Sequence, residues 1–372
     1  MKRMLTRIPL YVLLIWGAVV ASLIVFGTAK QPPPAPAITG PFAAIDDHDL
    51  PPLRRYRARD GAQLTFREYP GSGRQVAVLI HGSAGSSRDL HPLALALQAA
   101  GVNVLVPDLR GHGWNRPHGD IAYVGQLDDD LTDFIATQKP QFRTSEWTAV
   151  GFSSGGGFTL RIAAEASLGQ EFDRYILISP YLRHNAPSVR GADSEAKRDL
   201  SETAVRAQTW AAVSTGRIIG LTIINFLGVH IWDGLPVLGF PVPTDLDAVT
   251  CTYSWRLLQN FGAHTDYLAD IRRVDRPMRV FVGRSDELLD AEKLKIEFQT
   301  QRQDVPVVIL PGLGHSDMVT RPEAIRAITG AATADANASA SASASGASPS
   351  GFSSSSPSIP PSKPPAIPVS VL

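Results

Sequence analysis

A serine lies at the centre of a glycine-flanked motif, Gly151-Phe152-Ser153-Ser154-Gly155. An apolar run at 147–150 predicts a strand before the motif, and the residues at 158–166 predict a helix after it. In this context the central serine of G-x-S-x-G sits on a tight turn, and the helix that follows favours a developing oxyanion. The motif therefore predicts Ser153 as a nucleophile; a turn of small residues without chemistry is the alternative interpretation.

A serine hydroxyl becomes a good nucleophile only when a base removes its proton and a third group orients that base. His315 lies in a glycine-rich loop after the predicted strand 305–310, and Asp286 follows the predicted strand 279–282. Loops at the carboxyl ends of parallel strands meet at one edge of a sheet. We therefore expect His315 to act as the base and Asp286 to orient it, both of them beside Ser153.

Each of these assignments has an alternative. Asp286 could cap the helix predicted at 288–301, and Glu287 or Asp290 could take its place as the acid. His315 could be a loop histidine without a role, and Asp317 lies on the same loop, where we expect it to support His315. Four other histidines lie elsewhere and are weaker candidates for the base: His112, His184, His230 and His264.

A second small-residue loop, at 81–87, follows the first predicted core strand, 75–80. We expect the backbone amides of Ser83 and Ser154 to donate to the oxyanion of an acyl-transfer intermediate. Ser154 is not the expected nucleophile, because only Ser153 is central between the two motif glycines. The loop matches neither phosphate-binding glycine motif, and no histidine–carboxylate cluster has the spacing of a metal site. No cofactor and no metal ion are predicted.

Strands and helices alternate between the two ends of the chain. Continuous apolar runs predict buried strands at 75–80, 102–106, 147–150, 175–178, 279–282 and 305–310, with helices at 93–100, 127–137 and 158–166 among them. Such alternation is typical of an α/β fold with a mostly parallel sheet covered by helices on both faces. We assign this domain to residues 51–330.

Four segments, taken in this order, resemble a known family: 79–85, 107–113, 151–157 and the two loops that carry Asp286 and His315. Over residues 76–320 the chain resembles α/β-hydrolases of the lysophospholipase, monoacylglycerol lipase and serine aminopeptidase-like group. The resemblance implies the chain order serine, aspartate, histidine, and a structural role for Asp108 and residues 110–113. Phe152 departs from the histidine that is common at its position in this group.

The N-terminus has the features of a signal anchor. Lys2, Arg3 and Arg7 precede an uncharged run from residue 8 to 27, which as a helix would be about 30 Å long, the thickness of the hydrocarbon core. The charges predict a cytoplasmic N-terminus and an extracytoplasmic hydrolase domain. Cleavage near residues 27–29 and a buried helix are the alternatives.

Residues 28–50 predict an extended Pro-rich linker, and the Ala/Ser/Pro-rich residues 331–372 predict a disordered tail. Residues 182–270 are expected to form a helical cap over the site. This insertion contains the apolar run 218–229, which predicts either a helix packed on its own domain or one that lines an acyl pocket or dips into the membrane.

These features together predict a membrane-anchored serine hydrolase that cleaves a small-molecule or lipid-like carboxylic ester. A serine aminopeptidase-like peptidase uses the same chemistry, and Asp193, Glu195 and Glu202 would be candidates for binding a substrate amino group. A catalytically silent binding protein on the same fold is the other alternative.

Composition excludes other classes. Lys and Arg total 35, as do Asp and Glu, so the chain lacks the basic excess of a nucleic-acid-binding protein. Cys251 is the single cysteine, which rules out a disulfide within the chain. It lies outside any glycine-rich turn, so we expect it to have no catalytic role.

Overall fold

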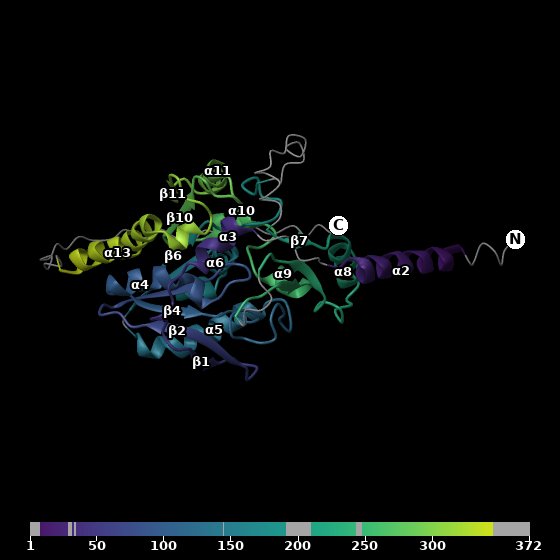
Figure 1. Ribbon diagram of the computed structural model, residues 1–372, viewed down its shortest axis with the longest axis horizontal. Coiled ribbons are helices and arrows are strands. Elements are labelled where there is room, and N and C mark those ends of the chain that lie inside the picture. Colours follow the sequence, from purple (N-terminus) through teal and green to yellow (C-terminus); the bar gives the residue numbers. More distant parts are fainter. Residues whose placement is uncertain are drawn as a thin grey trace, which may run out of the picture. The chain divides into compact units, whose positions relative to one another are not determined.

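The computed structural model describes residues 8–28, 32, 35–143, 145–190, 210–242 and 248–344 (Figure 1). The chain divides into two compact units, Met1–Ala334 and Asp335–Leu372. The first unit contains the sheet, the helices that cover it and the cap, and all predicted site residues fall within it.

An eight-stranded sheet forms the centre of this unit, in the order β1-β2-β4-β3-β5-β6-β10-β11. The strands from β4 to β11 are parallel, whereas β2 pairs antiparallel with both β1 and β4. This confirms the predicted mostly parallel sheet; the two charged antiparallel strands at one edge were not predicted. The bounds are β1 Arg54–Arg57, β2 Gln63–Tyr69, β3 Gln75–Ile80, β4 Asn103–Pro107, β5 Glu146–Phe152, β6 Arg174–Ile178, β10 Met278–Gly283 and β11 Val307–Leu310.

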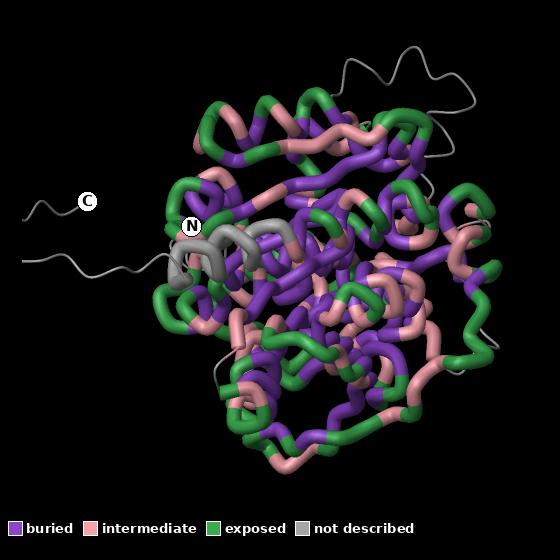
Figure 2. Tube along the Cα trace, turned by 90° about the vertical axis from the view of Figure 1, so that its left-hand side faces the viewer, coloured by how far each residue is buried: buried purple, intermediate pink, exposed green. Residues whose placement is uncertain are grey.

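Alternate side chains of the strands enter two separate cores, one on each face of the sheet. In β3, Val76 and Val78 pack with α5, α6 and α11, whereas Ala77 and Leu79 pack with α4 and α13. Figure 2 shows the buried strands between the more exposed helices. The helix bounds are α4 His91–Ala99, α5 Gln126–Gln138, α6 Ser154–Ala164, α10 Tyr267–Arg273, α11 Ala291–Gln301, α12 Asp317–Thr320 and α13 Pro322–Ala344, with short 3-10 turns at Ser87–Leu90, Lys139–Gln141 and Leu168–Glu171.

The cap lies in the chain between β6 and β10 and is not purely helical, which corrects the sequence prediction. Besides α8 (Thr215–Phe226) and α9 (Trp255–Asn260), it contains a three-stranded antiparallel sheet of β7 (Ala212–Val213), β8 (Pro236–Gly239) and β9 (Thr252–Ser254). Val, Thr and Tyr in these short segments favour strand conformation. Segments 191–209 and 243–247 lie outside the described residues.

Two helices precede the hydrolase domain: α2 (Ile8–Phe26) and α3 (Pro36–Ala43). Across the described ranges, no helix has both the length and the apolar character needed to span a bilayer. Helix α3 occupies part of the stretch predicted as an extended linker. It forms because Pro36 suits the first turn of a helix and because Ile38 is buried against the domain.

The last helix, α13, runs through the predicted domain end at residue 330 and continues to Ala344. Ala331 and Ala332 are buried in the same core as α4, so the first residues of the predicted tail belong to the folded domain. Alanine is the strongest helix former, which accounts for the extension. Residues 345–372 of the predicted tail lie outside the described residues.

Candidate active site

Ser153 occupies the turn between the end of β5 and the start of α6. Its backbone has φ 55° and ψ −121°, a left-handed conformation that is strained for a residue with a side chain. Glycine is required on both sides: a Cβ at Gly151 would lie 2.3 Å from the Gly155 carbonyl oxygen, and one at Gly155 would lie 2.3 Å from the His81 carbonyl oxygen. The turn thereby holds Ser153 rigidly beside the strand ends.

His315 bridges the two other predicted site residues. Its Nε2 lies 2.9 Å from Ser153 Oγ, and its Nδ1 lies 2.8 Å from Asp286 Oδ2. All three side chains are buried, Ser153 with 6% of its surface exposed. The structure thus brings together the residues predicted as nucleophile, base and acid, at distances that allow proton transfer from the hydroxyl to the imidazole.

The neighbouring carboxylates have different partners, which bears on the alternatives for the acid. Asp286 Oδ1 accepts hydrogen bonds from the amides of Leu288 and Leu289, so Asp286 fixes its own loop while it contacts His315. Asp290, not Asp286, caps α11. Glu287 accepts from the backbone amide of His315 at 2.8 Å and does not contact its ring nitrogens among the hydrogen bonds of the described residues.

Other residues of the loop that carries His315 also stabilise it through hydrogen bonds. Asp317 accepts a hydrogen bond from the Gly314 amide at 2.9 Å, the supporting position predicted for it. The hydroxyl of Ser316 donates to the carbonyl oxygen of Ile38 at 2.7 Å. Helix α3 therefore contacts the histidine loop directly, a contact that sequence reasoning did not predict.

Aromatic packing continues from α3 to the imidazole. The ring of Phe152 lies 5.0 Å from the ring of His315 and 6.1 Å from the ring of Phe42, centroid to centroid. Phe152 is the residue at which the chain departs from its resembled group. The departure places an apolar ring in contact with both α3 and the imidazole.

The two residues predicted to supply oxyanion amides lie side by side. Ser83 and Ser154 share a hydrogen bond between their hydroxyl oxygens, which are 2.6 Å apart. A Cβ at Gly82 would lie 3.1 Å from the Cβ of Ser153, so the loop at 81–85 approaches the nucleophile closely. Both backbone segments are thus in reach of an oxygen bound next to Ser153.

A tyrosine of the cap secures this loop, and sequence reasoning missed it. The Tyr253 hydroxyl accepts from the amide of Ala84, which follows Ser83, at 2.8 Å, and it lies 2.6 Å from His112 Nε2. Ala84 has a φ of 61°, so its strained backbone needs such support. Tyr253 belongs to no motif, and only its burial in the cap reveals the role.

Two buried histidines lie near this loop: His112 contacts Tyr253, and His81 packs against His112 with 5.0 Å between ring centroids. Complete burial lowers the pKa of His112 far below its ordinary value, and the neighbouring His81 lowers that pKa further. Burial also lowers the pKa of His81, whose Nε2 accepts from the Leu109 amide. Both rings are therefore neutral at pH 7, and their hydrogen bonds stabilise the surrounding loops.

The remaining candidates lie away from Ser153 or have structural contacts. His184 and His230 are exposed, and His264 pairs with Asp270. Asp108 accepts from the amide of Ser87, in keeping with the structural role that the resemblance implies. Cys251 is half-buried, and no metal-binding cluster of three side chains occurs in the described part of the chain. The carboxylates considered for a peptidase, Asp193, Glu195 and Glu202, lie outside the described residues.

Known proteins are similar to this chain in sequence or in fold. The protein NocK of Nocardia uniformis subsp. tsuyamanensis, named as an esterase, is 30% identical over 166 residues, which cover 36% of this chain and only 46% of NocK. A non-heme haloperoxidase of Rhodococcus erythropolis is 22% identical over 73% of this chain and 95% of its own length. Monoacylglycerol lipase from Paleococcus ferrophilus has the same fold, with a TM-score of 0.53 and 16% identity over 73% of this chain and 99% of that one.

The sequence also matches a family model. The model describes the alpha/beta hydrolase family and covers residues 77–328, from β3 to α13, a span that includes Ser153, Asp286 and His315. On this match, the chain is a member of the alpha/beta hydrolase family.

Proposed function

We propose that this chain is a serine hydrolase that cleaves a carboxylic ester through an acyl-enzyme, with Ser153 as nucleophile, His315 as base and Asp286 as the acid that orients the base. The observation that carries the proposal is the unbroken series of contacts from Ser153 Oγ through His315 to Asp286. Two residues of the sheet edge, Ser83 and Ser154, would supply the oxyanion amides.

The reaction follows from these positions. Ser153 Oγ attacks the ester carbonyl carbon while His315 Nε2 takes the hydroxyl proton, and the amides of Ser83 and Ser154 stabilise the oxyanion. His315 returns the proton to the leaving alcohol as the C–O bond breaks. Water then attacks the acyl-enzyme by the same route, which releases the acid and restores the Ser153 hydroxyl.

We propose an apolar, lipid-like ester, as for lysophospholipases and monoacylglycerol lipases, and a position at a membrane. The fold is shared with a protein whose title names it a monoacylglycerol lipase. Side chains at 11–16 of α2 are apolar and mostly exposed, and Lys2, Arg3 and Arg7 precede them in sequence. We propose that this N-terminal segment anchors the chain, with the N-terminus cytoplasmic and the hydrolase extracytoplasmic.

A fluorophosphonate probe tests the nucleophile, because it forms a covalent bond only with an activated serine. In detergent, the full chain should be labelled and Ser153→Ala should not. Ser154→Ala keeps its backbone amide and should retain labelling, which makes it the matched control. If the unaltered chain is not labelled, the enzyme proposal fails; if Ser153→Ala is still labelled, the assignment of the nucleophile fails.

A substrate panel separates ester from amide cleavage. We expect p-nitrophenyl esters to be cleaved with a preference for longer acyl chains, and aminoacyl-nitroanilides to be cleaved at least about 100-fold more slowly, a difference of about 3 kcal/mol in transition-state stabilisation. Faster cleavage of the nitroanilides would instead support the peptidase. Cleavage of neither class, in a chain that the probe does not label, would support a silent binding protein.

A further inference from the structure

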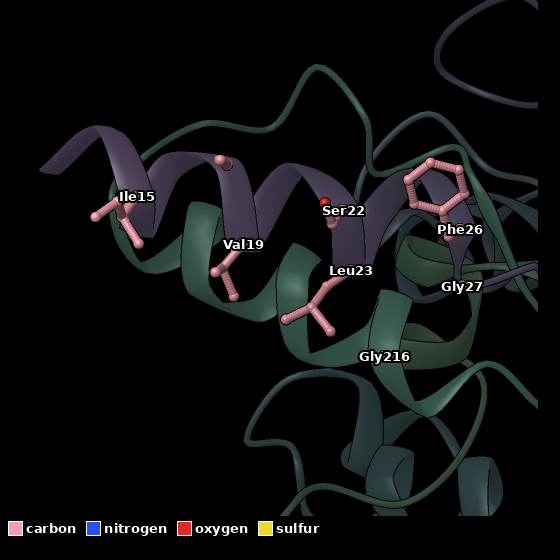
Figure 3. Close-up of a pocket in the computed structure, with 8 residues that line it drawn as sticks. Ile15, Val19, Ser22, Leu23, Phe26, Gly27 and Gly216 are labelled. Atoms are coloured by element: carbon pink, nitrogen blue, oxygen red, sulfur yellow. The ribbon is translucent and has the colours of Figure 1, made fainter. Parts of the chain in front are cut away.

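The cap helix α8 packs directly against the N-terminal helix α2, and glycine permits the close approach. A Cβ added at Gly220 would lie 2.7 Å from Ile24 Cγ1, and one at Gly27 would lie 2.6 Å from the backbone nitrogen of Arg217. Gly216 lies four residues before Gly220, the spacing of small residues that lets helices pack closely in membranes. The contacts pair the end of α2 with the start of α8, so the helices run in opposite directions (Figure 3).

A buried arginine joins the two helices. Arg217 of α8 donates through Nε to the carbonyl oxygen of Ile24 at 2.8 Å, and through a second nitrogen to that of Val25 at 3.4 Å. These carbonyls belong to the last turn of α2, which has no partners within its own helix. The pair is therefore fixed by polar contacts as well as by the apolar core of Ile24, Leu221 and Ile224.

Helix α8 and the turn that follows it expose large apolar side chains to solvent. We call Ile219, Phe226, Leu227, Ile231 and Trp232 the cap apolar face; Phe226 is 91% exposed and Ile231 is 78% exposed. The sequence from 218 to 232 contains no Asp, Glu, Lys or Arg. Exposed apolar groups that cluster in this way mark an interaction surface.

A groove beside α2 and α8 is also lined mostly by apolar side chains. It has a volume of about 600 Å³ and is lined by apolar side chains of α2, among them Ile15, Val19 and Leu23, and by Gly216 of α8 (Figure 3). Ser22 supplies the one polar side chain of the lining. This lining has the polarity of a site for an acyl chain, not for a polar ligand.

We infer that the cap apolar face is itself a bilayer contact, so that the cap enters the membrane interface beside α2. A protein partner would be met by a surface with a polar, charged rim, whereas residues 218–232 lack charge and carry Trp232, a residue type enriched at membrane interfaces. The continuity with the uncharged α2 favours the same lipid environment for both. This inference rests on the proposed membrane position and extends it from the N-terminal helix to the cap.

Site-specific fluorescence tests the contact in the full chain. With Cys251→Ser as background, Phe226→Cys carries an environment-sensitive NBD label, and Ile296→Cys is the matched control because Ile296 of α11 is also exposed, at 63%. On addition of phosphatidylcholine–phosphatidylglycerol vesicles, we expect NBD emission at position 226 to shift to the blue, and brominated lipids to quench it. The label at position 296 should not respond.

Two results would overturn the inference. One is a response at position 226 that is absent or no larger than the response at position 296, which would show that the cap apolar face makes no specific contact with the bilayer. The other is a blue shift at position 226 without vesicles that grows with protein concentration, which would mean that a second copy of the chain covers this face. Neither result depends on whether the chain hydrolyses an ester, so the inference and the proposed function can fail separately.

Kinetics provide a second readout. The double variant Phe226→Ser/Leu227→Ser removes apolar area from the face, so we expect hydrolysis of a monoacylglycerol held in vesicles to fall about 10-fold. Hydrolysis of p-nitrophenyl acetate in solution should stay within about 2-fold, because neither residue is part of the proposed catalytic machinery. Ile296→Ser should change neither rate. An equal loss on both substrates would contradict the inference, because it would indicate damage to the site.

Discussion

At the scale of single residues, Tyr253 links the cap to the oxyanion loop. Its hydroxyl contacts both the Ala84 amide and His112, and it is completely surrounded by protein. Tyr253→Phe leaves the amide without its partner, so we expect kcat for an ester to fall about 10-fold with little change in KM, and the free energy of unfolding to fall by about 1–3 kcal/mol.

The matched control for this variant is Tyr267→Phe. Tyr267 is another buried tyrosine, and its hydroxyl donates to Glu297, far along the chain from the oxyanion loop. It should lose a similar free energy of unfolding but keep its kcat. Equal effects of the two variants on kcat would mean that Tyr253 has only a general role in stability.

The buried histidines make stability depend on pH. Because the folded protein lowers the pKa of His112 and of His81, the stabilisation is present above the unfolded pKa of about 6.5 and is lost as the pH falls below it. We expect the free energy of unfolding to fall by about 1–2 kcal/mol per histidine between pH 7 and pH 5. Urea midpoints measured across this range give the slope.

His112→Gln should reduce that slope, since glutamine does not titrate. The exposed His48 is the control: a hydrogen bond to Asp46 raises its pKa, so its contribution has the opposite sign and His48→Gln should not flatten the slope. Because His81 keeps its own contribution, part of the slope should remain; a slope that is unchanged in His112→Gln would exclude His112 as a cause of acid sensitivity.

Sequence reasoning predicted the placement of residues that lie in recognisable local contexts. Gly151 and Gly155 identify Ser153 because the tight turn between them excludes larger residues. Asp286 and His315 follow two parallel strands, whose carboxyl ends lie at the same edge of the sheet as Ser153. Tyr253 could not be predicted in this way. Its partner Ala84 is 169 residues distant, and nothing in a segment of the cap indicates which loop it will meet.

At the scale of elements, the contact between α2 and α8 depends on Gly220. Gly220→Leu places atoms where Ile24 and Leu23 already lie, so we expect the helices to separate, with a loss of about 1–3 kcal/mol. Amide hydrogen exchange near Gly27 should then become faster. Gly17→Leu on α2 is the control, because a Cβ at Gly17 has no neighbour within 4 Å; equal exchange in both variants would disprove the packing role.

The sequence predicts the parallel strands but not β1 or α3. Each of the six parallel strands was predicted from its apolar run: five have mostly buried side chains on both faces, and β11, at the edge of the sheet, is half-buried. The strand β1 reads Arg54-Arg55-Tyr56-Arg57, and only Tyr56 is buried, so it has no apolar run to detect. Helix α3 contains Pro41 and follows a Pro-rich stretch, which hides a helix that docking stabilises.

At the scale of the whole molecule, the cap is joined to the core by a buried asparagine. Asn260 of the cap accepts from the amides of Gly125 and Leu127, and its Nδ2 donates to Asp128 at 2.7 Å. Arg256 and Asp120 form an ion pair nearby in sequence. These bonds predict that cap and core unfold together, in one transition.

Asn260→Ala leaves the buried amide of Leu127 and the half-buried amide of Gly125 without this partner, so we expect a loss of about 2–4 kcal/mol in the free energy of unfolding. Tryptophan fluorescence and far-ultraviolet circular dichroism should still report the same midpoint, lowered in both. Gln141→Ala, which alters an exposed residue of the core surface, should not shift it. If the cap unfolds at a lower midpoint than the core, the cap and the core are independent in their unfolding.

The hydrogen bond from Ser316 to Ile38 also sets an order in time. The two residues are 278 positions apart, and Arg217 follows Ile24 by 193. At about 5–20 residues per second, synthesis delivers Ser316 roughly 15–55 s after Ile38. The N-terminal segment thus leaves the ribosome long before its partners, so the contact between α3 and the histidine loop can form only after most of the domain has been synthesised.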